Sequence, residues 1–195
     1  MAYPTVSAPY GFKAINRVDG MPYAGAIRQL PIASTYTTAI FNGDLVKIVS
    51  GGTVEKDTST TTATPVGVLV GCQYVNSQGQ TVQAQFFPGS GVTNAVAYVV
   101  DDPYAAFKVA VTTNSSVMST VASSVVGKNA AFVVGTGNTI TGDSGASLDV
   151  SNVASTSALP LRVIAVVPET ATSSTAFTEV IVKINTHQYN NPTGV

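Results

Sequence analysis

The feature that most constrains the fold is an alternation of apolar and polar residues with a period of two. Val180, Val182 and Ile184 alternate with mostly polar residues, and the segment 81–86 alternates in the same way. Successive side chains of a β-strand point to opposite faces, so this pattern predicts half-buried strands. Helix signals are scarce, and we expect residues 115–126 to form a loop with a short 3₁₀ or α segment.

Turn-forming residues rich in glycine separate the alternating segments, as at Asn42-Gly43-Asp44 and Ser77-Gln78-Gly79. Short strands at such spacing are typical of sandwiches and barrels. We therefore predict an all-β fold, a barrel or sandwich of short antiparallel strands with an extended N-terminal arm and little helix. The expected strands cover residues 26–32, 45–49, 53–56, 66–75, 81–87, 95–100, 107–112, 130–134, 161–167 and 180–185.

The chain of 195 residues is long enough for one domain or one domain with a small appendage. We expect an N-terminal arm over residues 1–24 and a β-barrel-like core over residues 25–113. Residues 114–195 would form a second β-rich part, with an irregular loop rich in Gly, Ser and Thr at 135–157 and a C-terminal tail. The two β-rich parts could also form one continuous domain.

The N-terminal arm combines prolines with tyrosines, which are enriched at protein interfaces. Two interpretations stay open: a strap packed over the protein's own barrel, or an arm that docks on a neighbouring subunit. The tail is the second region expected to make contacts between subunits. The candidate interface residues are Tyr3, Pro4, Pro9, Tyr10, Phe12, Tyr23, His187 and Tyr189.

Few residues of this chain are suited to catalysis. Charged residues make up 10% of it, against about 25% in an ordinary soluble domain, and it has one histidine, one cysteine and no tryptophan. We expect Cys72 to be a small buried hydrophobic residue and His187 to lie at the surface or at an interface. The interpretation is a protein that is not an enzyme and has no cofactor and no metal site; a cation bound in the loop 135–157 stays open as an alternative.

Charge and hydropathy exclude two classes of partner. The formal net charge is −1, and Lys and Arg are scattered, whereas nucleic-acid binding relies on clustered cations. No apolar run approaches the roughly 18 residues of a membrane helix. The first residues lack the basic start and apolar core of a signal peptide, so we expect synthesis and folding in a cytoplasm.

Two short motifs stand out among the expected strands, Gly43-Asp44-Leu45-Val46 and Pro65-Val66-Gly67-Val68. They resemble a pattern of small capsid-associated proteins of tailed bacteriophages. In those proteins a strand beginning G-D-x-V is followed by a hairpin and then by a P-x-G-V strand. Further similar segments are 52–56, 101–107, 126–129, 141–145, 159–163 and 182–189.

This resemblance implies a head decoration, or cement, protein of the virion. Such a protein binds the outer surface of the capsid shell and stabilises it by bridging neighbouring capsid subunits. Its partners would be the major capsid protein and further copies of itself, as a homotrimer, and its location the capsid exterior after synthesis in the host cytoplasm. The resemblance supplies no catalytic residues.

Two other functions stay open. One is a different virion protein, from the tail tube, the neck or an adaptor ring, because those proteins also use β-barrels and extended arms. The other is a β-sandwich carbohydrate-binding module. Such a module needs an aromatic platform, for which Tyr36, Tyr74 and Tyr98 are the candidates in a chain without tryptophan.

Overall fold

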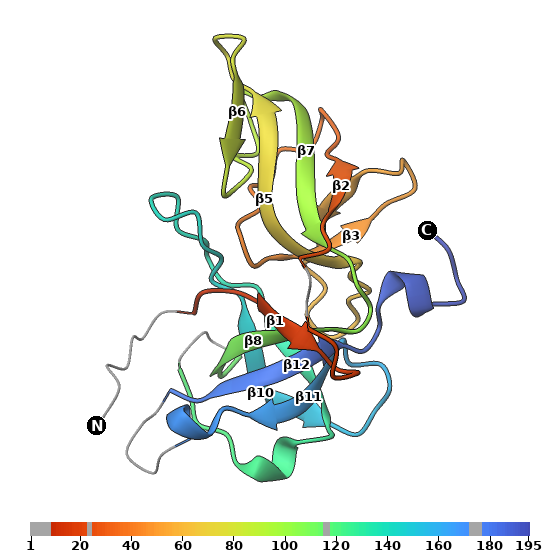
Figure 1. Ribbon diagram of the computed structural model, residues 1–195, viewed down its shortest axis with the longest axis vertical. Coiled ribbons are helices and arrows are strands. Elements are labelled where there is room, and N and C mark those ends of the chain that lie inside the picture. The colour runs from red at the N-terminus through yellow and green to blue at the C-terminus, as the bar shows by residue number, and fades with distance from the viewer. Residues whose placement is uncertain (1–8, 23–24, 115–117, 172–176) are drawn as a thin grey trace.

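β-Strands are the main regular elements of the computed structural model, which describes residues 9–22, 25–114, 118–171 and 177–195. They form two six-stranded sheets. Figure 1 shows one sheet curled into a barrel and the other standing above it. The only helical elements in the described residues are single 3₁₀ turns, η1 (Ser123–Val125), η2 (Pro168–Thr170) and η3 (Gln188–Asn190). The prediction of an all-β fold is confirmed.

The barrel is built mainly from the second half of the chain. Its strands are β1 (Lys13–Arg17), β8 (Ala105–Thr112), β9 (Asn129–Val133), β10 (Ser147–Ala154), β11 (Leu161–Val166) and β12 (Glu179–Ile184). The order is β1-β8-β10-β9-β11-β12, and β12 pairs with β8 to close the ring. All pairs are antiparallel except β8–β10, which is parallel. Closure leaves the strands β8 to β12 without the free edges of an open sheet, whereas β1 pairs with β8 alone and keeps one free edge.

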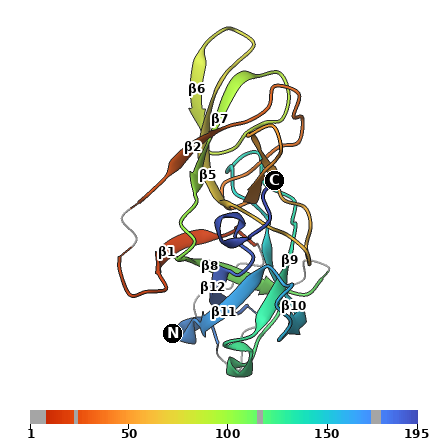
Figure 2. The same ribbon diagram turned by 90° about the vertical axis from the view of Figure 1, so that its right-hand side faces the viewer.

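The second sheet, here called the upper sheet, comes from the first half of the chain. Its strands are β2 (Arg28–Pro31), β3 (Leu45–Ile48), β4 (Val54–Lys56), β5 (Gly67–Val75), β6 (Thr81–Ala84) and β7 (Thr93–Val100). The order is β2-β7-β5-β3-β4, and β6 pairs with the C-terminal half of β5. Figure 2 shows this sheet rising from one end of the barrel.

Two apolar cores hold these elements. The barrel core contains Phe107, Leu148 and Val180, and it also takes in Leu45 and Val68 from the lower ends of upper-sheet strands. The second core lies against one face of the upper sheet. Because strands β3 and β5 contribute to both cores, burial of apolar surface stabilises the upper sheet and the barrel together.

The sequence missed two strands, β1 and β10. Strand β10 begins with Ser147, Leu148 and Asp149, all of them buried. Ser147 Oγ lies 2.6 Å from Thr112 Oγ1 and Asp149 Oδ1 accepts a hydrogen bond from Ser151 N, so polar residues fill positions where an apolar pattern was sought. Strand β1 lies within the segment expected to be an extended arm, and its mostly polar residues lack the apolar alternation that indicates a strand.

Strand pairing connects segments from all three expected parts of the chain. Strand β1, from within residues 1–24, pairs with β8. Strand β8 precedes residue 113 and pairs with β10 and β12, which follow it. The upper-sheet strands therefore lie in the sequence between two neighbouring strands of the barrel.

Candidate functional site

The N-terminal segment that follows residue 8 packs on the protein's own barrel. Gly11 N donates to Ala146 O at 3.1 Å, and Phe12 N donates to Gly43 O at 2.9 Å. The Phe12 side chain is 1% exposed and meets Phe132 edge-on in the barrel core, with ring centroids 6.4 Å apart. Phe12 is therefore a core residue within the single chain. Tyr3, Pro4 and Tyr23 lie outside the described residues.

Tyr10 fastens this segment to two barrel strands. Its hydroxyl donates to Glu179 Oε1 on β12 at 2.5 Å. Lys108 on β8 lies 3.3 Å from the other oxygen of Glu179 and 5.8 Å from the centre of the Tyr10 ring. Burial, and then the hydrogen bond to Glu179, raise the pKa of Tyr10 well above its usual range. The contacts of Tyr10 therefore fit the first interpretation, a strap packed over the protein's own barrel.

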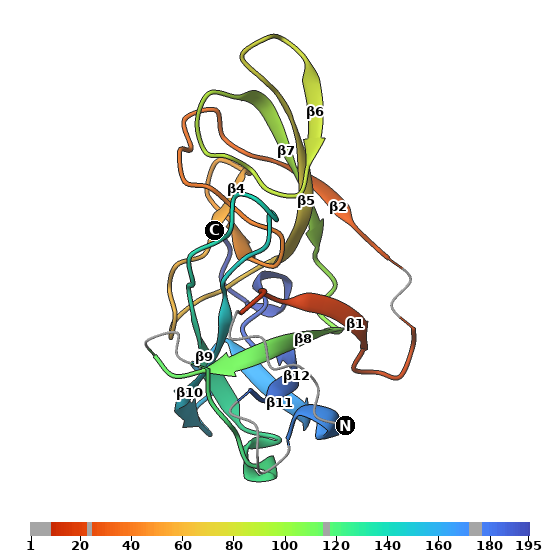
Figure 3. The same cartoon turned by 90° about the vertical axis from the view of Figure 1, so that its left-hand side faces the viewer.

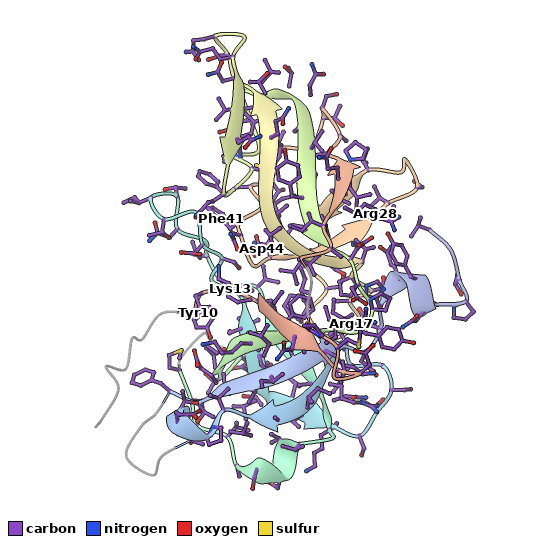
Figure 4. All side chains as sticks on the ribbon, viewed as in Figure 1. Tyr10, Lys13, Arg17, Arg28, Phe41 and Asp44 are labelled. Atoms are coloured by element: carbon purple, nitrogen blue, oxygen red, sulfur yellow. The ribbon has the colours of Figure 1, made fainter. Side chains whose placement is uncertain are left out.

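A buried carboxylate joins the upper sheet to the barrel. Asp44, 1% exposed, accepts hydrogen bonds from Phe41 N at 2.8 Å and from Ser144 Oγ at 2.6 Å. Lys56 Nζ lies 2.9 Å from Asp44 Oδ2, and the same ammonium lies 5.9 Å from the centre of the Phe41 ring. Figure 4 shows Phe41 and Asp44 where the base of the upper sheet meets the barrel. These contacts enclose Asp44, which therefore has a structural role in the described part of the chain.

A second set of contacts clamps the loop 134–146 against the turn before β3. Asn42 N donates to Gly142 O at 3.0 Å, and Ser144 N donates to Asn42 O at 2.9 Å. Lys13 Nζ bridges Asp143 Oδ1 at 2.8 Å and Asn42 Oδ1 at 3.0 Å. The glycines of the loop allow this approach: a Cβ on Gly137 would lie 2.1 Å from the Phe41 ring. The glycine-rich pattern therefore serves packing.

The segment after β12 folds back on the upper sheet. Gln188 uses its side-chain amide to accept from Ile48 N and donate to Ile48 O, each at 2.8 Å. The amide thus satisfies the backbone N–H and C=O groups of Ile48, at a part of β3 that does not pair with β5. Thr186 Oγ1 donates to Ala63 O at 2.6 Å, and Gln188 N donates to Pro65 O. The expected extended tail thus begins as an ordered latch.

His187 is buried within this latch and is 1% exposed. Its Nδ1 accepts from Tyr189 N, while Nε2 has no hydrogen-bond partner among the described residues. Burial lowers the pKa of His187 and outweighs the opposing influence of Asp101, Asp102 and backbone carbonyls. The sequence placed His187 at a surface or interface because it follows the last strand; the return of the chain onto the upper sheet covers it instead.

Tyr189 is the member of the latch that reaches solvent, with 43% of its surface exposed. Its hydroxyl donates to Asp101 Oδ2 at 2.9 Å, and the Arg28 guanidinium lies 5.4 Å from the centre of its ring. Arg28 Nε is 2.7 Å from the same Asp101 oxygen. These contacts tie the C-terminal segment to β2 and to the end of β7.

The reactive side chains sought in the sequence are enclosed. Cys72 is a free, fully buried cysteine, as predicted, and burial raises the pKa of its thiol to about 12. Among the described residues, no three His, Cys, Asp or Glu side chains gather as a metal site would require. In the same part of the chain, no helix is long and apolar enough to cross a membrane.

The three candidate tyrosines of an aromatic platform do not share a face. Tyr36 and Tyr74 pack against the core of the upper sheet, and Tyr36 stacks on Phe87. Tyr98 alternates with the core residues Ala97 and Val99, so it lies on the opposite, outward face of the sheet. Its hydroxyl donates to Gln73 Oε1 at 3.1 Å.

The outward face of β5, β6 and β7 is uncharged. Residues 58–100, which contain β5, β6 and β7, include no Asp, Glu, Lys, Arg or His. Strand register places the residues of one row side by side across four strands: Pro31, Val96, Gln73 and Gln83. Figure 3 shows this end of the molecule standing clear of the barrel. The absence of charge is readable in the sequence. Only the structure shows that β6 and the adjoining halves of β5 and β7 form the exposed end, whereas Ala63, Val68 and Val100 of the same stretch belong to the barrel core.

Comparison of the chain with protein-family models, with curated proteins and with solved structures found no match.

Proposed function

We propose that this chain is a structural protein of a tailed-phage virion that binds the outer surface of the capsid and stabilises the shell by bridging neighbouring capsid subunits. The resemblance of residues 43–46 and 65–68 to capsid-associated proteins is one support. The all-β architecture, a closed barrel carrying an open sheet, suits a rigid component made in many copies.

The observation that carries the proposal is the uncharged end of the molecule that β6 and the adjoining halves of β5 and β7 form within the charge-free stretch 58–100. About 25% of the residues of an ordinary soluble domain are charged. The core of a protein–protein interface, by contrast, is depleted in charge. An exposed end that carries polar amides and hydroxyls and no charge is therefore suited to repeated contacts with protein neighbours.

The state of the chain's most reactive side chains supports a role without catalysis. A cysteine nucleophile works as the thiolate and needs a lowered pKa, whereas burial raises that of Cys72 to about 12. His187 is enclosed in the C-terminal latch. We assign the protein no cofactor, and its partners would be the major capsid protein and other copies of itself.

The copy number of the chain in purified virions of the phage that encodes it tests this proposal. Quantitative mass spectrometry against the major capsid protein should give a ratio near one to one for a protein spread over the shell. A few to a few dozen copies per particle would move the protein to the tail tube, the neck or an adaptor ring. Complete absence from the particle would overturn the virion assignment.

A truncation separates attachment from folding. Removal of residues 1–8 leaves Tyr10 and Phe12 in place on the barrel, so the truncated chain should unfold at the temperature of the full chain. If the arm contacts the shell, the truncated chain should bind stripped capsids more weakly than the full chain. Equal binding would assign attachment to the described part of the molecule.

A further inference from the structure

A strand at the edge of a sheet has unpaired backbone N–H and C=O groups that can pair with another chain. Proteins protect such edges from pairing with charged residues, proline, bulges or short strands. Three edges of this fold carry such protection. Strand β1 has a charged residue at each end and a register shift, β2 has an arginine and a proline, and β4 is three residues long with two charges. The protecting residues are Lys13, Arg17, Arg28, Pro31, Glu55 and Lys56.

Strand β6 is the exception. Its residues, Thr81–Ala84, include neither charge nor proline, and it pairs with β5 without a register shift. Among the described residues, no backbone hydrogen bond joins 81–85 to any segment other than β5. Figures 1 and 3 both place β6 at the margin of the upper sheet. The loop 140–142 lies beside Gln85, just past the end of the strand.

The sequence of this edge is symmetric in polarity. In Thr81-Val82-Gln83-Ala84-Gln85, polar residues stand at both ends and at the centre, and one apolar residue lies on each side of the central glutamine. Two such strands running antiparallel about Gln83 would set Gln83 against Gln83, Val82 against Ala84, and Thr81 against Gln85. Strand register then keeps the apolar pairs on the core side and the glutamines on the outward side of a continuous sheet.

We propose that two copies of this chain associate by antiparallel pairing of their β6 strands about a two-fold axis at Gln83. A two-fold contact uses the same patch on both subunits and must be complementary to itself. The uncharged stretch 58–100 meets this demand, because identical ends that carried net charge would repel each other. The contact adds a strand to an exposed sheet edge, a recognised mode of protein association.

This inference deepens the proposed function by naming a partner, a second copy, but its test needs no virion. Pairing through one short edge is weak in isolation and gains strength when many copies are held together. Sedimentation of the purified full chain over a wide concentration range should show reversible dimer formation. A chain that stays monomeric throughout would overturn the inference and leave the copy-number test of the virion assignment unaffected.

Substitutions at the axis make the test specific. Gln83→Lys sets two like charges opposite each other, so association should weaken about five-fold at low ionic strength and recover partly with salt. Gln83→Glu should act in the same way. An equal mixture of the two variants should regain association, because opposite charges then meet across the axis. Failure of the mixture to associate would refute the pairing of Gln83 with itself.

Gln29 provides the matched control. It is an exposed glutamine on the same outward face, but on β2 at the opposite edge of the sheet. Gln29→Lys should leave association unchanged. If Gln29→Lys weakens association as much as Gln83→Lys does, the contact uses the face of the sheet, and the assignment to the β6 edge is wrong. Circular dichroism melts of all variants should match that of the unchanged chain, since both side chains are exposed.

Discussion

Substitution of Asp44 tests whether the buried carboxylate joins the two halves of the fold. Asp44→Ala removes the counter-charge of Lys56, whose side chain is 9% exposed, and the acceptor of Phe41 N. Breaking a buried ion pair by removing one partner costs about 3–5 kcal/mol, because the remaining charge stays buried and unpaired. For a chain of this size each kcal/mol shifts the melting temperature by about 2–4 °C, so we expect a loss of roughly 6–20 °C.

Asp143→Ala is the control for this prediction. Asp143 also pairs with a lysine at 2.8 Å, but the two side chains, Lys13 and Asp143, are 34% and 41% exposed. Exposed pairs contribute at most about 1 kcal/mol. Urea unfolding followed by circular dichroism measures both variants. If Asp44→Ala loses no more stability than Asp143→Ala, the reasoning from burial is refuted.

A second substitution isolates the ion pair from the other contacts of Asp44. Lys56→Met removes the charge that Asp44→Ala leaves unpaired, so it should restore part of the lost stability when added to that variant. In the unchanged chain the same Lys56→Met substitution should destabilise, because Asp44 then becomes the unpaired charge. Additive losses in the double variant would show that the pair contributes no coupling.

Three further outcomes follow from the contacts described. The folded state holds His187 with a lowered pKa, so below about pH 6.5 the unfolded chain binds more protons than the folded chain, and stability falls as the pH is lowered. The urea midpoint should therefore be lower at about pH 5.5 than at about pH 7.5. The substitution His187→Asn should reduce this difference. Phe12→Ala should cost about 3–5 kcal/mol in urea unfolding, and a loss below about 1 kcal/mol would show that the strap is not part of the core. Gly67→Ala should lower the melting temperature or the soluble yield, because the added Cβ would lie 2.1 Å from Val100 O. Gly79→Ser, in a turn with open space, should cost only the backbone strain that a φ of 77° imposes on a residue other than glycine.

Most strands could be predicted because their apolar residues alternate visibly. In β12 the buried residues Val180, Val182 and Ile184 sit at every second position. Strand β10 lacked that signal because Ser147 and Asp149 are buried with hydrogen-bond partners, Thr112 on β8 for Ser147 and the nearby Ser151 for Asp149. Pattern recognition assumes that buried positions are apolar, and it fails where polar side chains are satisfied inside the protein.

The candidate interface residues were harder to place because tertiary contacts decide their environment. Phe12 lies among prolines and tyrosines that resemble an exposed arm, yet it fills the barrel core. His187 follows the last strand as a tail residue would, yet the chain turns back and encloses it. No local pattern distinguishes a strap from a free arm, because both are extended and poor in regular secondary structure.

The separation of β1 and β8 in the sequence has a consequence for synthesis. These strands are neighbours in the barrel, but the whole upper sheet is translated between them. While the chain emerges from the ribosome, the strands of the upper sheet are available to pair long before β12, which closes the ring against β8, has been made. Pairing between segments so distant in sequence is slow, and the exposed strand edges of an unclosed barrel favour aggregation. Nascent chains that stop short of residue 179 therefore lack a closed barrel, and premature termination should yield products that proteases remove.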